Sequence, residues 1–327
     1  MSPPPKHLPP QPHKLVDPLV LGTICGLASA VIYTAANAFL RSVSDCDLVW
    51  VSAVKALPTV LFMFPWVVIL YRKGHRVGAS WPILLLIAGA GLIGQMVGNI
   101  SFQYALGEVG VALAVPLTLG GMIVSATILG RIFLHEPVSP RAALSLGILL
   151  VAIAILSLGA DDARAAVTRQ PGTRLELAAG VAAGCLSGLA YSILNVVIRY
   201  TALKGMPLPS TLLIVSLVGI LSLGTLSYLR LGTAGIAATG SRDLTMMLLA
   251  GVCNALAFLA LSKSLQLMSV LYVNALNATQ ATLAAAAGVL IFGEALSPWL
   301  LAGIGLTIGG LLVLSRGRQS LIPPRPA

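Results

Sequence analysis

Charged residues are scarce in this 327-residue sequence, where Asp, Glu, Lys and Arg together make up 9%. A soluble protein carries about 25% charged residues, because these side chains keep its surface hydrated. Here 57% of the residues are hydrophobic and the mean hydropathy is +0.95. Such a composition excludes a water-soluble domain of this size and predicts an integral membrane protein.

Sequence signatures of nucleotide, metal and redox chemistry are also missing. The sequence has no P-loop, no dinucleotide-binding glycine fingerprint, no HExxH and no aspartate-rich cluster. Cys25, Cys46, Cys185 and Cys253 show no CxxC or metal-ligand spacing and are interpreted as inert thiols. We therefore expect no cofactor, no bound metal and no ATP-driven chemistry. Nor do we expect a nucleic-acid partner, because the basic residues occur singly or in short groups between apolar runs.

Ten apolar runs are long enough to cross a bilayer, which takes about 20 residues per helix. The predicted spans are roughly 18–40, 48–71, 81–104, 109–133, 141–160, 175–198, 207–230, 243–265, 268–292 and 298–315. The fold class predicted is an all-α integral membrane protein with ten transmembrane helices.

The distribution of Lys and Arg predicts the orientation of these spans, because basic residues concentrate in cytoplasmic loops. With the N-terminus inside, the cytoplasmic side receives Lys6, Lys14, Arg72, Lys73, Arg76, Arg131, Arg141, Arg199, Lys204, Lys263, Arg316, Arg318 and Arg325. The outer side receives Arg41, Arg164, Arg169, Arg174, Arg230 and Arg242. This excess predicts a multi-pass protein of the plasma (inner) membrane with both termini in the cytoplasm. Residues 1–17 are proline-rich and predicted to form a disordered tail, and 317–327 a second tail.

The sequence repeats itself at a shift of 158 positions. Helix one then matches helix six at Gly22/Gly180, Gly26/Gly184, Ser29/Ser187, Tyr33/Tyr191, Asn37/Asn195 and Arg41/Arg199, and Glu136/Glu294 and Pro140/Pro298 match as well. The pattern predicts a five-helix repeat over 18–160, a polar linker over 161–174 and a second repeat over 175–316. Since five is odd, the second copy enters the membrane from the opposite side, which gives the inverted repeats common in secondary transporters.

Uncharged polar side chains recur within the predicted spans. Tyr33 and Asn37, with their counterparts Tyr191 and Asn195, lie on one helical face with the repeated glycines. The other candidates are Gln95, Asn99, Asn254, Asn274, Asn277 and Gln280. Polar groups avoid lipid, so these side chains should face the bundle interior. They serve either as helix-packing hydrogen bonds or as the lining of a substrate pathway, and the sequence leaves both open.

Lys55 lies about seven residues into the second predicted span, roughly 10 Å deep at 1.5 Å per residue. An ionisable residue at that depth is a functional candidate. Facing a cavity, it would favour an anionic or zwitterionic substrate. The alternative is that its long stem carries the ammonium back to the membrane interface.

Glu136 and Glu294 each begin a Glu-x-x-Ser-Pro sequence before the last helix of a repeat. Ser-Pro is a favourable helix start, and an acidic group there suits the helix dipole. A second hypothesis pairs the repeats by charge. The predicted topology puts Arg199 with Glu136 on the inner side and Arg41 with Glu294 on the outer side, so alternating salt bridges would close the two mouths.

The two repeats end in FLHEPVSPRAALSLGILLVAIAIL and IFGEALSPWLLAGIGLTIGGLLVL. Together with ten spans in two five-helix halves, these segments resemble the EamA group of the drug/metabolite transporter superfamily over nearly all of residues 18–316. The resemblance implies secondary transport, often export, of amino acids or other small metabolites. Small multidrug resistance proteins of that superfamily use an acid within helix one. Residues 18–40 contain none, which disfavours that coupling mechanism.

Two classes of function remain at this point. The first is alternating-access transport of a small polar metabolite, with membrane lipid and a small-molecule substrate as partners and a homodimer left open. The second is a membrane enzyme acting on lipid, or a scaffold. An enzyme should carry acids, histidines or a nucleophile clustered near the interface, and a scaffold would not need polar stripes. The sequence favours transport.

Overall fold

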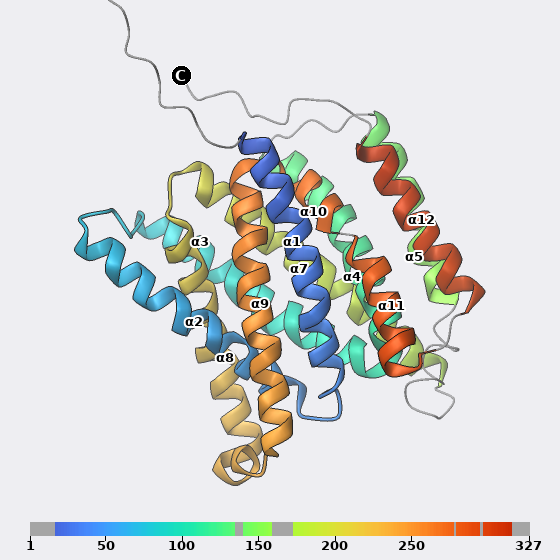
Figure 1. Ribbon diagram of the computed structural model, residues 1–327, viewed down its shortest axis with the longest axis horizontal. Helices are drawn as coiled ribbons and strands as arrows, with labels where there is room; N and C mark the ends of the chain where they lie inside the picture. The colour runs from blue at the N-terminus through green and yellow to red at the C-terminus, as the bar shows by residue number, and fades with distance from the viewer. Residues whose placement is uncertain (1–16, 135–139, 159–172, 278, 295–296, 316–327) are drawn as a thin grey trace, which may run out of the picture.

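The computed structural model describes residues 17–134, 140–158, 173–277, 279–294 and 297–315. Within these ranges all regular secondary structure is helical (Figure 1). The first half contains α1 (Pro18–Arg41), α2 (Leu48–Arg72), α3 (Trp81–Leu92), the π-helix η1 (Ile93–Asn99), α4 (Ile100–Phe133) and α5 (Pro140–Leu158). The second half contains α7 (Arg174–Leu203), α8 (Leu208–Ala237), α9 (Ser241–Leu267), α10 (Val270–Asn277), α11 (Gln280–Phe292) and α12 (Pro298–Ser315).

Six helical stretches of the described residues are long and apolar enough to cross a membrane. They are Pro18–Arg41, Leu48–Arg72, Trp81–Phe133, Arg174–Leu203, Leu208–Ala237 and Ser241–Leu267. The shorter apolar helices are Ala143–Leu156, Gln280–Phe292 and Pro298–Gly310. The protein is therefore an all-helical multi-pass membrane protein.

Gly110 interrupts the 53-residue stretch Trp81–Phe133. Its φ of 74° lies in the left-handed region, where a side chain would be strained, so a glycine is suited to this break. Two helical segments result, 81–109 and 111–133. The sequence predicts a turn around Glu108, and the structure has its break two residues later.

The two halves pack against each other along their length. α2 packs against α8 and α5 packs against α12, while α1 lies on α9 and α7 lies on α4. Figure 1 shows α1 running from the upper end of the view downward and α7 running upward from the lower end. The first turn of α1 and the last turn of α12 both lie at the upper end.

The repeated glycines bring helices into close contact, as their spacing predicts. A Cβ at Gly22 would lie 2.8 Å from Met268 Sδ, and one at Gly26 would lie 2.9 Å from Leu276 Cδ1. In the second half, a Cβ at Gly184 would lie 3.1 Å from Leu117 Cβ. This end of each stripe is therefore a helix-packing surface.

Gly188→Ala is expected to lower stability, because the new methyl group would meet the backbone of α4. Its Cβ would lie 2.6 Å from Met122 N, so α7 would have to move away. Overpacking of this kind costs about 1–3 kcal/mol. Thermal unfolding in detergent should show a clear drop in Tm. Gly224→Ala is the control: no atom lies within 4 Å of its Cβ, and its Tm should not fall. Equal Tm values for the two variants would contradict the proposed close approach.

Candidate functional site

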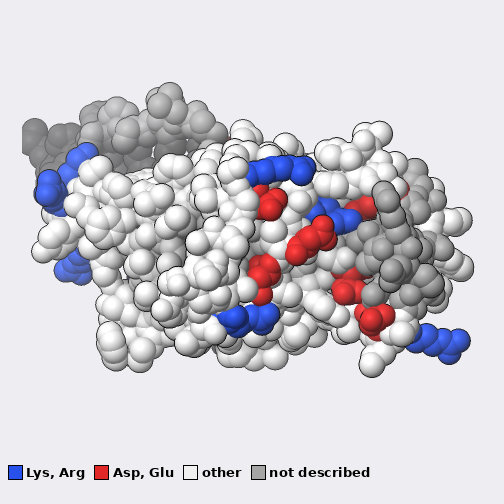
Figure 2. All heavy atoms as spheres, turned by 90° about the horizontal axis from the view of Figure 1, so that it is seen from below, with Lys and Arg blue, Asp and Glu red and all other residues white. Residues whose placement is uncertain are grey.

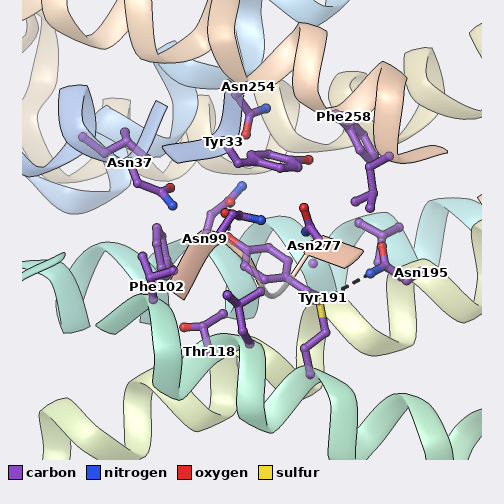
Figure 3. Close-up of a pocket in the computed structure, with 18 of the residues that line it drawn as sticks. Tyr33, Asn37, Asn99, Phe102, Thr118, Tyr191, Asn195, Asn254, Phe258 and Asn277 are labelled. Atoms are coloured by element: carbon purple, nitrogen blue, oxygen red, sulfur yellow. Dashed lines mark hydrogen bonds between the residues drawn. The ribbon is translucent and has the colours of Figure 1, made fainter. Parts of the chain in front are cut away.

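A cavity of about 120 Å³ lies where the two halves meet (Figure 3). Its walls come from α1, α2, η1, α4, α7, α9, α10 and α11. The lining includes these residues predicted from the polar pattern: Tyr33, Asn37, Lys55, Gln95, Asn99, Tyr191, Asn195, Asn254, Asn277 and Gln280. Polar residues far apart in the sequence thus lie together around one chamber.

Lys55 points into this chamber and not toward the membrane interface. Its side chain is buried, with the residue 4% exposed, and Nζ donates a hydrogen bond to Asn99 Oδ1 at 2.8 Å. The sequence alone allows either placement. In the structure, the Lys55 ammonium lies beside the Asn99 amide of η1. The side chain therefore does not extend to the membrane interface.

Asn99 is the centre of a chain of polar contacts that joins both halves. Its Oδ1 also accepts from the Tyr191 hydroxyl at 2.6 Å, and its Nδ2 donates to Gln95 Oε1. Gln95 Nε2 in turn donates to Val215 O at 3.5 Å. Gln95 and Asn99 project from the π-helix η1, a distortion often found at functional sites.

Two glycines make room for this chain. A Cβ at Gly219 would lie 2.7 Å from Gln95 Cδ, and a Cβ at Gly98 would lie 2.8 Å from the Tyr191 ring at Cε1. Larger residues at either position would displace the side chains that hold Asn99. The glycines therefore help to fix the orientation of the Asn99 amide.

Asn274 is the one predicted pathway residue that the structure leaves out of the cavity lining. It is fully buried, and its Oδ1 accepts from Asn195 Nδ2 at 3.3 Å. Asn274 thus makes a helix-packing hydrogen bond that holds the side chain of the lining residue Asn195. The sequence alone does not show that Asn274 and Asn277 have different roles. Asn277, three positions later, lines the cavity and accepts a hydrogen bond from Ser29 Oγ at 3.0 Å.

Four other lining residues keep their polar groups open toward the chamber. Within the described chain, no hydrogen bond engages the side chain of Tyr33, Asn37, Asn254 or Gln280. In Figure 3, Tyr33 and Asn254 lie across the chamber from Tyr191 and Thr118. These groups can donate to or accept from a solute between them.

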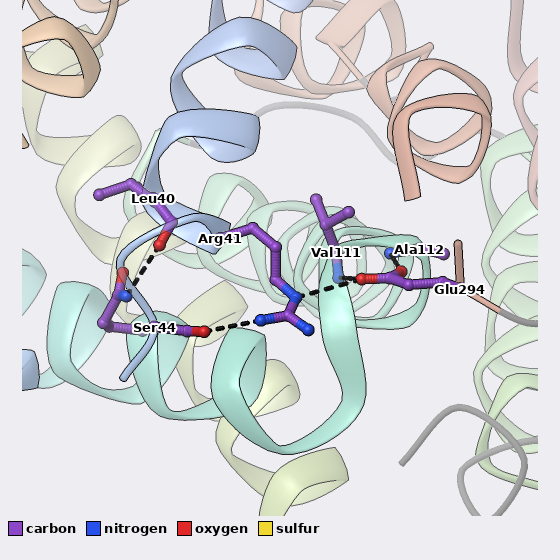
Figure 4. A network of polar contacts seen from close by, with 7 residues as sticks. Leu40, Arg41, Ser44, Val111, Ala112 and Glu294 are labelled. Carbon is purple, nitrogen blue, oxygen red and sulfur yellow. Dashed lines mark hydrogen bonds and ion pairs between the residues drawn. The ribbon is translucent and has the colours of Figure 1, made fainter. Parts of the chain in front are cut away.

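Arg41, the last residue of α1, forms a salt bridge with Glu294 (Figure 4). Arg41 Nε lies 3.2 Å from Glu294 Oε1, and Arg41 Nη1 donates to Ser44 Oγ at 2.6 Å. The Glu294 carboxylate also accepts from the backbone N–H groups of Val111 at 3.0 Å and Ala112 at 2.8 Å. The charge pairing expected between the repeats is present at this mouth.

The printed hydrogen bonds of the Glu294 carboxylate go to a helix other than the one that follows it in the sequence. Ser297 caps α12 by accepting from Leu300 N at 3.1 Å, as the Ser-Pro pattern predicts. The carboxylate instead binds the start of the helical segment after Gly110, whose first amides have no partner within the helix. Glu294 thus links α1, the start of a first-half helix and the end of α11.

The second predicted pair is only half described, because Glu136 lies outside the described residues. Arg199 is buried, and its Nη1 donates to Leu265 O at 2.7 Å and Gln266 O at 3.0 Å at the end of α9. The pairing of Arg199 with Glu136 stays a prediction.

The model of the EamA-like transporter family matches residues 20–158 and, in a second copy, residues 178–316. The chain belongs to this family. Members of the family are membrane transporters of the drug/metabolite type, which agrees with a polar chamber inside an apolar helical bundle.

The fold of this EamA-like protein also resembles a solved structure titled "Crystal structure of protein". The two are 18% identical with a TM-score of 0.66, over 90% of this chain and 96% of the other. At that identity the likeness concerns the fold alone. No curated protein matches the chain.

The chamber of this EamA-like protein also contains residues that the polar pattern missed. They include Phe102, Thr118, Met122 and Phe258. Phe258 lies one turn beyond Asn254 and Phe102 one turn beyond Asn99, so helical spacing from a polar candidate would have found both. Thr118 and Met122 lie in an apolar run and carry no such signal.

Proposed function

We propose that this EamA-like transporter carries a small polar metabolite, an amino-acid-like or similar organic solute, by alternating access without ATP. The observation that carries the proposal is the chamber between the two halves, lined by amides, two tyrosines and one lysine. The Arg41–Glu294 salt bridge at the end of α1 supports a gate on one approach to it. Export is the direction we propose, since it is common in the resembling family.

The architecture that we propose is ten spans in two inverted repeats, 18–160 and 175–316. Helices lie within each of the ten apolar runs. Gly110 divides one long stretch, and α10 (Val270–Asn277) and α11 (Gln280–Phe292) both lie within 268–292. The opposite directions of α1 and α7 support the inversion (Figure 1). So does the packing of α2 on α8 and of α5 on α12, each helix against its counterpart. Such halves exchange roles when a transporter changes conformation.

The charges support both termini being cytoplasmic. Figure 2 shows acidic and basic side chains gathered on the face seen from below. The lower helix ends carry the basic residues Arg41, Arg174, Arg230 and Arg242, beside the acids Asp45, Asp47, Glu108, Glu176, Asp243 and Glu294. The opposite ends carry more basic residues, namely Arg72, Lys73, Arg76, Arg131, Arg141, Arg199, Lys204 and Lys263. Basic residues favour the cytoplasmic side, so we place the lower face outside.

Reporter fusions test this topology. Alkaline phosphatase, which is active only outside the cytoplasm, should be active when inserted within 161–174 and inactive when fused after residue 327. Green fluorescent protein should give the reverse pattern. The expected contrast follows from five spans on each side of the linker. The same reporter result at both positions would contradict the inverted arrangement.

Uptake and counterflow in proteoliposomes, over a panel of radiolabelled metabolites, test the transport itself. At least one small polar solute should exchange across the vesicle membrane without ATP and faster than in protein-free vesicles. Efflux from preloaded cells then gives the direction. If no solute of the panel exchanges while the purified protein remains folded and monodisperse, a scaffold is the better description.

A further inference from the structure

We infer that the Lys55 side of the chamber is a subsite for a carboxylate, so that the solute is a small carboxylate-bearing metabolite. The existence of a transported solute rests on the proposed function. The subsite itself rests on the charges and hydrogen bonds around Lys55.

The described residues that line the chamber include one lysine and no acid. In the described part of the chain, the salt bridges join Arg41 to Glu294 and Arg230 to Asp47, and none reaches Lys55. A buried charge left unpaired is strongly destabilising. A ligand that brings its own negative charge would supply the missing partner.

The hydrogen bonds leave Lys55 able to accept such a ligand. An ammonium group has three donors. Among the described residues only Asn99 Oδ1 accepts from Nζ. The same oxygen also accepts from Tyr191, and Gln95 holds the other side of the Asn99 amide. The network thus fixes the ammonium from one side and leaves two donors for the chamber. Such fixed donors lower the cost of ordering a ligand.

The number of charges favours a carboxylate over a phosphate. Among the described residues that line the chamber, Lys55 is the only Lys or Arg. Phosphate, which carries more charge, is typically bound by guanidinium groups or by helix N-termini. The other lining groups are uncharged. They are amides, hydroxyls and aromatic rings, together with the apolar side chains of Leu40, Val115, Leu119, Met122, Leu194 and Leu261, and they suit the uncharged part of a small monoanion.

A charge-selective labelling experiment tests the subsite without knowing the solute. Asn254→Cys is made in a background in which Cys25, Cys46, Cys185 and Cys253 are serine. Its labelling rate is measured with the anionic sulfonatoethyl methanethiosulfonate and with its cationic trimethylammonium counterpart. Since a nearby positive charge attracts one reagent and repels the other, Lys55→Gln should lower the anion-to-cation rate ratio by about tenfold. Lys55→Arg should preserve the ratio.

Lys263→Gln is the matched control, because Lys263 lies on α9 outside the chamber lining and donates to Gln266 Oε1. It should leave the ratio unchanged. A ratio that does not respond to Lys55→Gln, or a cysteine that neither reagent labels, would overturn the inference.

Competition identifies the group that is bound. Acetate should slow labelling of Asn254→Cys when Lys55 is present and should lose this effect in Lys55→Gln. Inorganic phosphate and methylammonium should protect less. Stronger protection by either of these two would overturn the assignment to a carboxylate. Labelling does not depend on transport, so a negative labelling result with intact proteoliposome exchange refutes the subsite alone. The converse result refutes the proposed function alone.

Discussion

Glu294→Gln should break the salt bridge with Arg41 that we propose as a gate. A cysteine one helical turn farther into the chamber should then be labelled about 100-fold faster. The carboxylate holds three partners together: the Arg41 guanidinium and the backbone N–H groups of Val111 and Ala112. An amide at this position keeps one acceptor, but its NH₂ group would face a backbone N–H that also donates. Arg41 would lose its counter-ion as well.

The size of the effect follows from burial. The Glu294 side chain is only 4% exposed and that of Arg41 is 14% exposed. Removing one partner of a buried pair costs about 3–5 kcal/mol. Even about 2.7 kcal/mol of that cost, taken from the closed state alone, shifts an equilibrium about 100-fold. Transport should slow, because the closed conformation has lost the salt bridge that stabilises it.

Asn37→Cys reports on this opening, because Asn37 lies one turn before Arg41 on α1 and lines the chamber. The rate of its modification by a membrane-impermeant maleimide is compared with and without Glu294→Gln, in the background that lacks native cysteines. Arg230→Gln is the control. It breaks the salt bridge to Asp47, in which the Arg230 side chain is 51% exposed, and such pairs contribute at most about 1 kcal/mol. If both substitutions change the rate equally, Arg41–Glu294 is not a gate.

The polar chamber could be predicted largely from the sequence because periodicity identifies helix faces. Tyr33, Asn37, Tyr191 and Asn195 repeat at one shift and at helical spacing, and all four line the chamber. The same argument predicts the close helix contacts of the glycines at the N-terminal end of each stripe. Polarity and spacing therefore identify which helix face turns inward, wherever the surrounding solvent is lipid.

The partners of those side chains could not be predicted in the same way. The depth of Lys55 is compatible with two placements, and only the position of Asn99 decides between them. Glu294 binds the N–H of Val111, 183 residues earlier in the chain. A backbone amide exists at nearly every residue and leaves no mark in a sequence. The π-helix η1, which orients Gln95 and Asn99, has no such mark either.

Asn99→Asp should abolish transport of a carboxylate-bearing solute while leaving the fold as stable as before, or more stable. The new carboxylate would lie where Asn99 Oδ1 now accepts from Lys55 Nζ at 2.8 Å and from the Tyr191 hydroxyl at 2.6 Å. It would supply an internal counter-ion in the place of the solute. Gln95 would turn its amide to donate to it, and would give up only the 3.5 Å contact to Val215 O.

The decisive measurement pairs stability with transport for Asn99→Asp and Asn99→Leu. Leucine has a similar size but leaves Lys55 and Tyr191 without their acceptor, so it should lower both Tm and transport. The aspartate variant should keep its Tm and lose at least about tenfold in carboxylate exchange, because a solute must then displace a charge-assisted bond already made. It should also lose the preference of Asn254→Cys for the anionic reagent. An aspartate variant that exchanges carboxylates at the wild-type rate would show that Lys55 does not bind the solute, since a neutralised ammonium cannot attract a second anion with undiminished strength.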